Sequence, residues 1–215
     1  MIGGTATGST AGSEASLPFG PLDGGTLHLC IDMQRLFLEP GPWYCPDGLA
    51  LLPEIRRLVA HAPGRSLFTR FITARSPETA HGAWQRYYRR WRAVTQAEAG
   101  TEVLALHGEL APLAAPGDVY DKAVHDAFLS EAFRERVARE APSALVFSGV
   151  ETDVCVLAAA LSAVDLGYRT VIATDAVASS VPESHAACLA RIYPRFDQQI
   201  ELATVDEILA AWTAA

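Results

Sequence analysis

The sequence predicts an α/β fold in which helices cover both faces of a parallel sheet. From residue 26 onward, short apolar segments typical of strands alternate with longer segments of helical periodicity. Strands that are separated by helices imply right-handed crossovers, which make the sheet parallel. The chain has 215 residues, of which 50% are hydrophobic, so one domain with a substantial core is expected.

The expected strands and helices follow one another in a regular order. Strands are predicted within residues 26–33, 66–73, 118–128, 144–150 and 170–179, and at the start of 200–212. Helices are predicted over residues 51–60, 133–139, 154–166 and 184–192, and at the end of 200–212. Gly167 directly follows the third of these helices, and glycine commonly terminates a helix.

The composition indicates a globular protein that binds neither nucleic acid nor membranes. Charged residues make up 20% of the chain and the formal net charge is −8, which disfavours nonspecific binding to polyanions. No apolar stretch reaches the roughly 18 residues of a membrane span, and the first residues do not resemble a secretory signal. The four cysteines have neither C-x-x-C nor zinc-type spacing, which argues against disulfides and a structural metal. A cytoplasmic location is therefore expected.

Two segments stand outside the regular alternation of strands and helices. Residues 1–25 are rich in Gly, Ser, Thr and Ala, so we expect a flexible N-terminal arm, with residues 26–215 as a single domain. Residues 75–116 form a long insertion between strands. Its aromatic residues recur at helical spacing, at Trp84, Tyr87, Tyr88 and Trp91. Such a stripe is typical of a core or an oligomer interface, and a lid over a binding site is the alternative.

Cys155 lies where a predicted strand turns into a predicted helix. The apolar run 144–147 ends in Ser-Gly, a short polar turn follows, and the thiol falls in the first helical turn. Thr152 or Asp153 would be the N-cap. The positive end of the helix dipole then favours the thiolate, which makes Cys155 a candidate nucleophile. A buried structural cysteine is the competing interpretation.

Three chemically active residues follow predicted strands. Asp32 comes after the first strand, Lys122 after the third and Cys155 after the fourth. In open parallel sheets, binding sites lie at the carboxyl ends of the strands, so these three side chains are expected to converge there. An acid, a base and a thiol together have the chemistry for acyl transfer.

Three segments resemble the isochorismatase-like cysteine hydrolases. They are IDMQ around Asp32, DKAVHDAF around Lys122 and SGVETDVCVLAAALSAVDLGYRTVIATDAVAS around Cys155, and the likeness covers roughly residues 26–208. The resemblance implies a three-layer α/β/α fold with a mainly parallel six-stranded sheet, usually in homodimers or homotetramers. It also implies an Asp32-Lys122-Cys155 catalytic triad and a cis peptide between Val150 and Glu151. Backbone N–H groups of Glu151 and Cys155 would then bind the oxyanion.

The sequence departs from two groups within this family. The nicotinamide-hydrolysing members resemble one another in an Asp-x-His-x-His metal motif, but Arg70 and Phe71 stand in the matching region here and His81 is isolated. We therefore expect no catalytic metal and no cofactor. Members that cleave the vinyl ether of isochorismate typically lack the cysteine, so that reaction is disfavoured too. The remaining prediction is a C–N hydrolase similar to N-carbamoylsarcosine amidase, acting on a small amide, ureide or carbamoyl compound.

Substrate contacts are predicted less directly. Gln34, Phe37, Arg70 and Trp84 are candidates to line the pocket, and an inward-pointing Arg70 would favour a carboxylate on the substrate. A surface ion pair of Arg70 is the alternative. Two other functions remain open, namely an inert binding module of the same fold and a redox-sensing thiol protein. The redox function would need a resolving partner, for which Cys188 is the candidate.

Overall fold

A parallel sheet of six strands forms the centre of the structure, a computed structural model that describes residues 17–213. The strands are β1 (Leu27–Ile31), β2 (Ser66–Phe71), β3 (Val119–Lys122), β4 (Leu145–Val150), β5 (Thr170–Ala178) and β6 (Ile200–Ala203). Their order across the sheet is β3-β2-β1-β4-β5-β6, and every neighbouring pair is parallel. The predicted fold class is confirmed.

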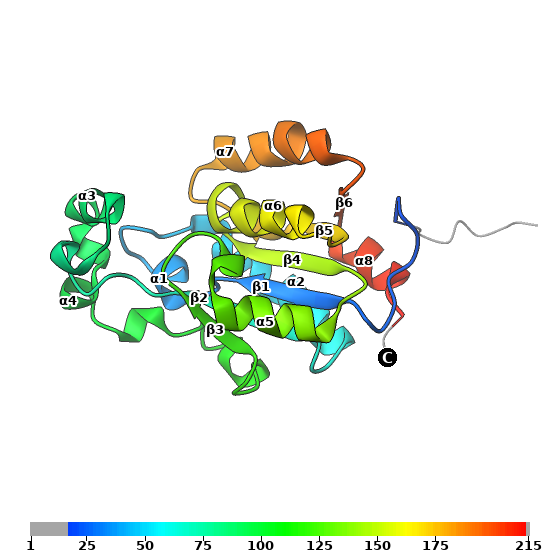
Figure 1. Cartoon of the computed structure of the whole chain (residues 1–215), viewed down its shortest axis with the longest axis horizontal. Helices are drawn as coiled ribbons and strands as arrows, with labels where there is room; N and C mark the ends of the chain where they lie inside the picture. The colour runs from blue at the N-terminus through cyan, green and yellow to red at the C-terminus, as the bar shows by residue number, and fades with distance from the viewer. Residues whose placement is uncertain (1–16, 214–215) are drawn as a thin grey trace, which may run out of the picture.

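Helices cover both faces of this sheet (Figure 1). They are α1 (Arg35–Leu38), α2 (Leu52–His61), α3 (Ala83–Arg90), α4 (Gln96–Ala99), α5 (Glu131–Glu140), α6 (Leu157–Asp165), α7 (Pro182–Ala187) and α8 (Val205–Ala211). Helices α5 and α6 lie in front of the sheet in Figure 1, whereas α2 and α8 pack against each other behind it. This arrangement is the one that right-handed crossovers produce.

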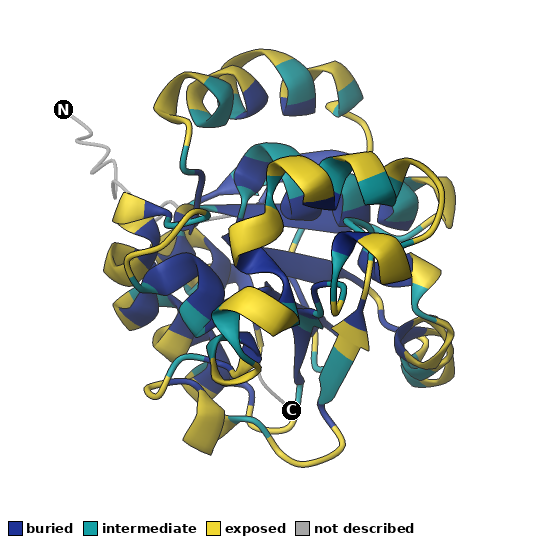
Figure 2. Cartoon of the chain, turned by 90° about the vertical axis from the view of Figure 1, so that its left-hand side faces the viewer, coloured by how far each residue is buried: buried dark blue, intermediate teal, exposed yellow. Residues whose placement is uncertain are grey.

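The core is centred on β1 and β4, in which every residue is buried. Strands that are covered on both faces are largely apolar, and the polar side chains of His28 and Ser148 in these two strands hydrogen-bond each other at 2.7 Å. Figure 2 shows the buried strands in the middle of the molecule and the exposed faces of the helices around them. Gly149 allows β4 to approach β1 closely, because an added Cβ would lie only 2.1 Å from the backbone oxygen of Ile31. Its φ of +107° also suits glycine alone.

The helix after β4 begins differently from the prediction. A π-helical turn, Thr152–Val156, precedes α6, and the extended residue before that turn is Glu151. Neither Thr152 nor Asp153 is therefore the N-cap. The predicted helix over residues 184–192 is likewise divided, into α7 and a π-helical turn, Cys188–Ile192. A π-helical turn shifts the hydrogen-bond pattern locally, and apolar periodicity does not reveal it.

The predicted arm is too long at its C-terminal end. Residues 1–16 lie outside the described part of the chain, but residues 17–25 pack against the domain. Leu17 and Leu22 are buried. The backbone N–H of Leu22 donates to Ala211 and its carbonyl accepts from Thr213, both at 2.9 Å. The folded domain therefore includes residues 17–25, because Leu17 and Leu22 bury their side chains against it.

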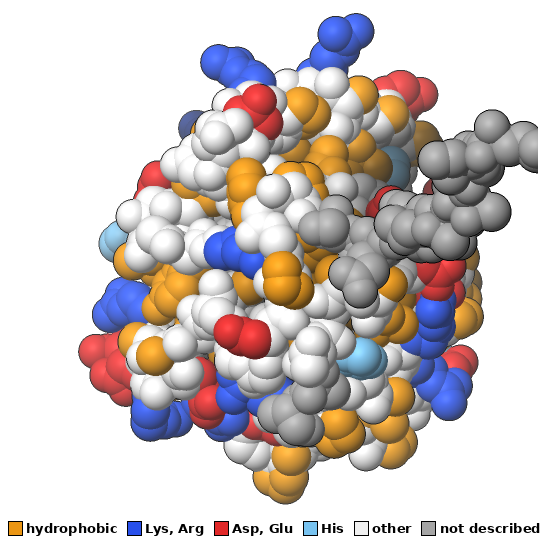
Figure 3. Space-filling model, turned by 90° about the vertical axis from the view of Figure 1, so that its right-hand side faces the viewer, with side chains coloured by type: hydrophobic (Ala, Val, Ile, Leu, Met, Phe, Trp, Pro, Cys, Tyr) orange, Lys and Arg blue, Asp and Glu red, His pale blue; other side chains and the backbone are white. Residues whose placement is uncertain are grey.

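The two ends of the sheet differ in character. The insertion 75–116, with α3 and α4, lies at the end where the parallel strands terminate (Figure 1). The opposite end shows basic and acidic side chains interspersed with apolar ones (Figure 3). Within residues 17–213, no helix has the length and apolar character needed to cross a bilayer.

Candidate active site

Asp32 and Lys122 form a buried ion pair at the carboxyl ends of β1 and β3. Nζ of Lys122 lies 2.7 Å from Oδ2 of Asp32, and the two side chains are 1% and 0% exposed. Because β2 lies between β1 and β3, the lysine side chain reaches across the end of β2. Asp32 leaves β1 with a φ of +51°, a left-handed conformation that Asp tolerates better than most residues.

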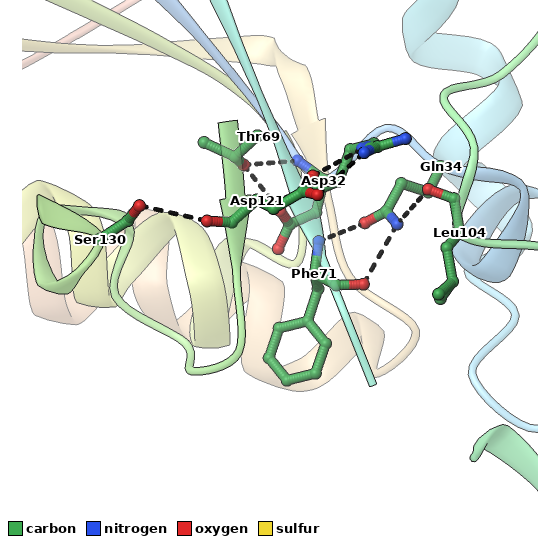
Figure 4. Close-up of polar contacts among 8 residues, drawn as sticks. Asp32, Gln34, Thr69, Phe71, Leu104, Asp121 and Ser130 are labelled. Carbon is green, nitrogen blue, oxygen red and sulfur yellow. Dashed lines mark hydrogen bonds and ion pairs between the residues drawn. The ribbon is translucent and has the colours of Figure 1, made fainter. Parts of the chain in front are cut away.

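Thr69 of β2 orients the Asp32 carboxylate. Its hydroxyl donates to Oδ1 at 2.6 Å and accepts from the Asp32 backbone N–H at 3.1 Å (Figure 4). Oδ2 faces Lys122 and is not fixed by a hydroxyl. One carboxylate oxygen is thus fixed by a hydroxyl, and the other is available to exchange a proton.

Lys122 is held in its charged form despite burial. Nζ donates to the backbone carbonyl of Val124 at 3.1 Å and lies 4.8 Å from the centre of the Phe71 ring. Burial disfavours the ammonium, but the nearby Asp32 carboxylate and Cys155 outweigh this effect, so the pKa of Lys122 is raised. The side chain therefore provides a positive charge next to the thiol.

Cys155 is buried and interacts electrostatically with both members of the ion pair. Burial is the main reason why the pKa of its thiol is raised. The Asp32 carboxylate adds to the increase, and the Lys122 ammonium opposes it. The predicted preference for thiolate is therefore opposed by burial, which disfavours the charged form of the thiol. The Sγ atom also lies 3.9 Å from Nδ1 of His125.

The segment that carries Cys155 is fixed by its own side chains. The peptide between Val150 and Glu151 is cis, as predicted. The Glu151 carboxylate accepts from the backbone N–H of Ser180 at 2.9 Å, and Asp153 accepts from the Ser179 hydroxyl at 2.6 Å. These contacts tie the start of the π-helical turn to the segment that follows β5.

A cavity of about 290 Å³ adjoins Cys155. Its walls come from the segment after β1, the end of β2, the insertion, the segment after β3, the Cys155 turn and the segment after β5. The lining side chains include Phe37, Trp43, Phe71, Tyr87, Trp91, His125, Glu151 and Asp153. The thiol therefore opens into a small and mainly aromatic chamber, as expected of a site for a small molecule.

The aromatic stripe of the insertion borders this cavity. Tyr87 and Trp91 line it, whereas Tyr88 is buried beneath. Trp84 lines an adjoining open groove and packs against His125, with ring centres 5.0 Å apart. This placement agrees with the interpretation of the aromatic stripe as a lid over a binding site.

The four predicted substrate contacts have different outcomes. Phe37 lines the cavity, and Trp84 lies beside it. Gln34 does not reach it: its amide donates to the carbonyls of Leu104 and Phe71 and accepts from the Phe71 N–H (Figure 4). It is fully buried and joins the first residues after β1 to β2 and the insertion, so the predicted substrate contact is wrong.

Arg70 also points away from the cavity. Side chains alternate along a strand, and its neighbours Thr69 and Phe71 face the site, so Arg70 faces the other side of the sheet. There it forms a bidentate ion pair with Asp121, at 2.7 and 2.9 Å. The surface ion pair is therefore the correct alternative, and the predicted recognition of a carboxylate by Arg70 is wrong.

The residues that sequence reasoning missed are Thr69, Trp43 and His125. His125 follows Lys122 by three residues within the quoted DKAVHDAF segment, which was a signal for its position. Thr69 and Trp43 had no comparable signal, because their roles arise only when strands and loops come together. Within residues 17–213, no group of three or more His, Cys, Asp or Glu side chains is arranged to hold a metal ion.

Comparisons with known proteins agree with this architecture. The family model described as Isochorismatase domain matches residues 26–204. No curated protein matches the sequence. Among solved structures, an isochorismatase-like hydrolase from Alkaliphilus metalliredigens is 23% identical, with a TM-score of 0.66 and coverage of 88% of this chain and 98% of the other.

Two amidases have the same fold. The N-carbamoylsarcosine amidase from Thermoplasma acidophilum is 17% identical, with a TM-score of 0.65 and coverage of 84% of this chain and 96% of that one. A nicotinamidase from Staphylococcus aureus is 20% identical, with a TM-score of 0.57 and coverage of 78% and 95%. Such low identities establish a common fold only. The family match extends from the strand before Asp32 to beyond β6, and the chain therefore belongs to the isochorismatase family of hydrolases.

Proposed function

We propose that the protein is a cysteine hydrolase that cleaves the C–N bond of a small amide, ureide or carbamoyl compound through a thioester. The observation that supports this most directly is the buried Asp32–Lys122 ion pair, which acts on the Cys155 thiol at the wall of a small cavity. A base, a positive charge and a nucleophile are thereby available to one small molecule.

The first step is attack by sulfur. Asp32 accepts the thiol proton through Oδ2, and the Lys122 ammonium stabilises the thiolate as it forms. The need for a base follows from the raised pKa of Cys155, since a neutral thiol is a poor nucleophile. The sulfur then adds to the carbonyl carbon of the substrate.

The second step is departure of the nitrogen. The backbone N–H groups of Glu151 and Cys155 receive the negative oxygen of the tetrahedral intermediate. Protonated Asp32 returns its proton to the nitrogen, the C–N bond breaks, and ammonia or an amine leaves. The acyl group stays on sulfur as a thioester.

The third step is hydrolysis of the thioester. Asp32 removes a proton from a water molecule, which attacks the thioester carbonyl, and the sulfur leaves as a thiolate that takes the proton back from Asp32. The net reaction consumes one water and forms a carboxylic or carbamic acid together with ammonia or an amine. Amidases of the same fold, one acting on N-carbamoylsarcosine and one on nicotinamide, support this reaction class.

Ammonia release from a panel of small amides, ureides and carbamoyl amino acids tests the proposal. Wild-type protein is compared with Cys155→Ala and with Cys188→Ala, a matched removal of a second buried thiol. We expect a substrate whose turnover falls at least about 1000-fold in Cys155→Ala and is retained in Cys188→Ala. Turnover that survives in Cys155→Ala would contradict the covalent route, and silence across the panel would favour the inert binding module.

A further inference from the structure

The cavity beside Cys155 is walled by aromatic rings that surround Trp43. The centre of the Trp43 ring lies 5.9 Å from Phe37, 5.8 Å from Phe71, 5.9 Å from Tyr87 and 6.3 Å from Trp91. All five of these side chains line the cavity. Ring faces carry partial negative charge and attract cations, so several rings around one chamber form a site suited to an ammonium group.

The charged groups of the cavity wall are negative. Glu151 and Asp153 line it, and their described hydrogen bonds come from the neutral donors Ser180 N–H and Ser179 hydroxyl. Neither carboxylate forms an ion pair with a described Lys, Arg or His. None of the described lining residues is Lys or Arg. Neither of the two negative charges is thus offset by an ion pair within the described part of the chain.

The other titratable groups at the site do not offset these charges. Burial and the Lys122 charge lower the pKa of His125, which favours the neutral form of its ring. Lys122 itself is paired with Asp32 at 2.7 Å. Arg70 is paired with Asp121 on the other side of the sheet. An anionic substrate would therefore meet two carboxylates without a compensating cation.

A protein cation, Arg90, contacts this aromatic cluster from outside the cavity. The guanidinium carbon of Arg90 lies 5.4 Å from the centre of the Trp91 ring. Arg90 lines the adjoining open groove and not the cavity. The contact indicates that a ring of this cluster is accessible to a positive charge.

We propose that the hydrolase described above acts on a small amide that carries an ammonium group, with the cation seated among the aromatic rings and the carbonyl carbon at Cys155. Substrate selection rests on Trp43 and its neighbouring rings together with Glu151 and Asp153. The proposal presupposes the hydrolytic function, but its binding component can be measured without any reaction.

Binding is tested with three compounds of similar shape and different charge. Choline, uncharged 3,3-dimethylbutan-1-ol and anionic 3,3-dimethylbutanoate are titrated into wild-type protein by calorimetry. We expect choline to bind about tenfold more tightly than the alcohol, and the anion to bind most weakly. Equal affinities, preference for the anion, or no detectable binding of choline would overturn the proposal.

Variants assign the effect to the cavity. Glu151→Gln, Asp153→Asn and Trp43→Leu should each weaken choline binding several-fold. The two carboxylate variants should leave the alcohol unaffected. Glu183→Gln is the matched control, because Glu183 is exposed in the first turn of α7 and does not line the cavity. Equal loss of choline binding in the control would contradict the assignment.

Ammonia release separates this proposal from the hydrolytic one. The substrates are trimethylammonioacetamide, its uncharged isostere 3,3-dimethylbutanamide, and malonamate. A lower KM for the first, with the difference reduced in Glu151→Gln, supports both proposals. Cys155-dependent hydrolysis that prefers malonamate or the uncharged amide would leave the hydrolase intact and refute the cation site. Selective choline binding without hydrolysis of any amide would support the cation site and refute the hydrolase.

Discussion

The ammonium group of Lys122 lies 2.7 Å from the carboxylate of Asp32, and both side chains are almost completely excluded from solvent. Each charged group is therefore stabilised by the other, because an unpaired charge that is buried so deeply would lose its hydration without compensation. The pair is also positioned to act on Cys155, whose pKa depends on both partners.

Breaking this ion pair should destabilise the protein as well as inactivate it. Lys122→Met leaves the Asp32 carboxylate buried and unpaired, and we expect a loss of about 3–5 kcal/mol in the free energy of unfolding. Asp32→Asn should have a comparable effect. The double variant should lose less than the sum of the single losses, because it leaves no unpaired charge. Urea denaturation measures all three, and strictly additive losses would contradict the coupling.

Alkylation of Cys155 should be slow at neutral pH. Burial raises the pKa of its thiol above the ordinary value of 9.0, so the reactive thiolate accumulates only in alkaline solution. The rate constant for iodoacetamide, followed by mass spectrometry of the Cys155 peptide, should still increase through pH 9 in the free protein. Lys122→Met should lower the rate further, since the ammonium favours the thiolate. A plateau below pH 8 would show that the thiol is already ionised.

The raised pKa of the Cys155 thiol also predicts that the protein loses stability in alkaline solution. The unfolded state releases the Cys155 proton near the ordinary thiol pKa of 9.0, whereas the folded state retains it to higher pH. Stability from this group is therefore fully present below about pH 9 and decreases as the pH rises toward the folded pKa. Cys155→Ala should reduce this alkaline decrease in the free energy of unfolding, and Cys188→Ala is the comparison.

The strands and the three strand-end residues could be predicted because each depends on local information. Apolar runs mark the buried strands, and polar residues directly after them mark the carboxyl edge of the sheet. The pairing of Asp32 with Lys122 across β2 agrees with this geometry. The ionisation of Cys155 could not be predicted in the same way, because it depends on how deeply the π-helical turn is buried.

The residues that line the pocket could not be predicted without knowing which way each side chain points. Gln34 follows Asp32 by two residues, yet it turns inward to satisfy backbone groups of β2 and the insertion. Trp43 becomes the centre of the aromatic cavity only because Phe37, Tyr87 and Trp91 are brought to it from separate segments. Such long-range contacts leave no periodic pattern in the sequence.

Substitutions at Gln34 and Arg70 should distinguish a structural role from a surface role. Gln34→Leu leaves a buried N–H and two carbonyls without their partner, each at a cost of about 1–3 kcal/mol, so a large loss of stability is expected.

Arg70→Ala removes a partly exposed ion pair worth about 1 kcal/mol or less. Substrate KM should be unchanged in Arg70→Ala. A marked rise in KM would instead place Arg70 at the substrate.

Gly149 should tolerate no side chain, because its position determines how β4 meets β1 next to Asp32. An added Cβ would lie 2.1 Å from the Ile31 oxygen, and backbone cannot move aside as a flexible side chain can. Gly64 is the matched control, since it also has a positive φ, of +77°, but no atom lies within 4 Å of its added Cβ. Gly64→Ala should cost about 1–2 kcal/mol for the left-handed conformation alone. Gly149→Ala should lower the free energy of unfolding clearly more, as measured by chemical denaturation. It should also reduce turnover, because any shift of Ile31 displaces the adjoining Asp32. Equal losses of stability in the two variants would contradict this close approach.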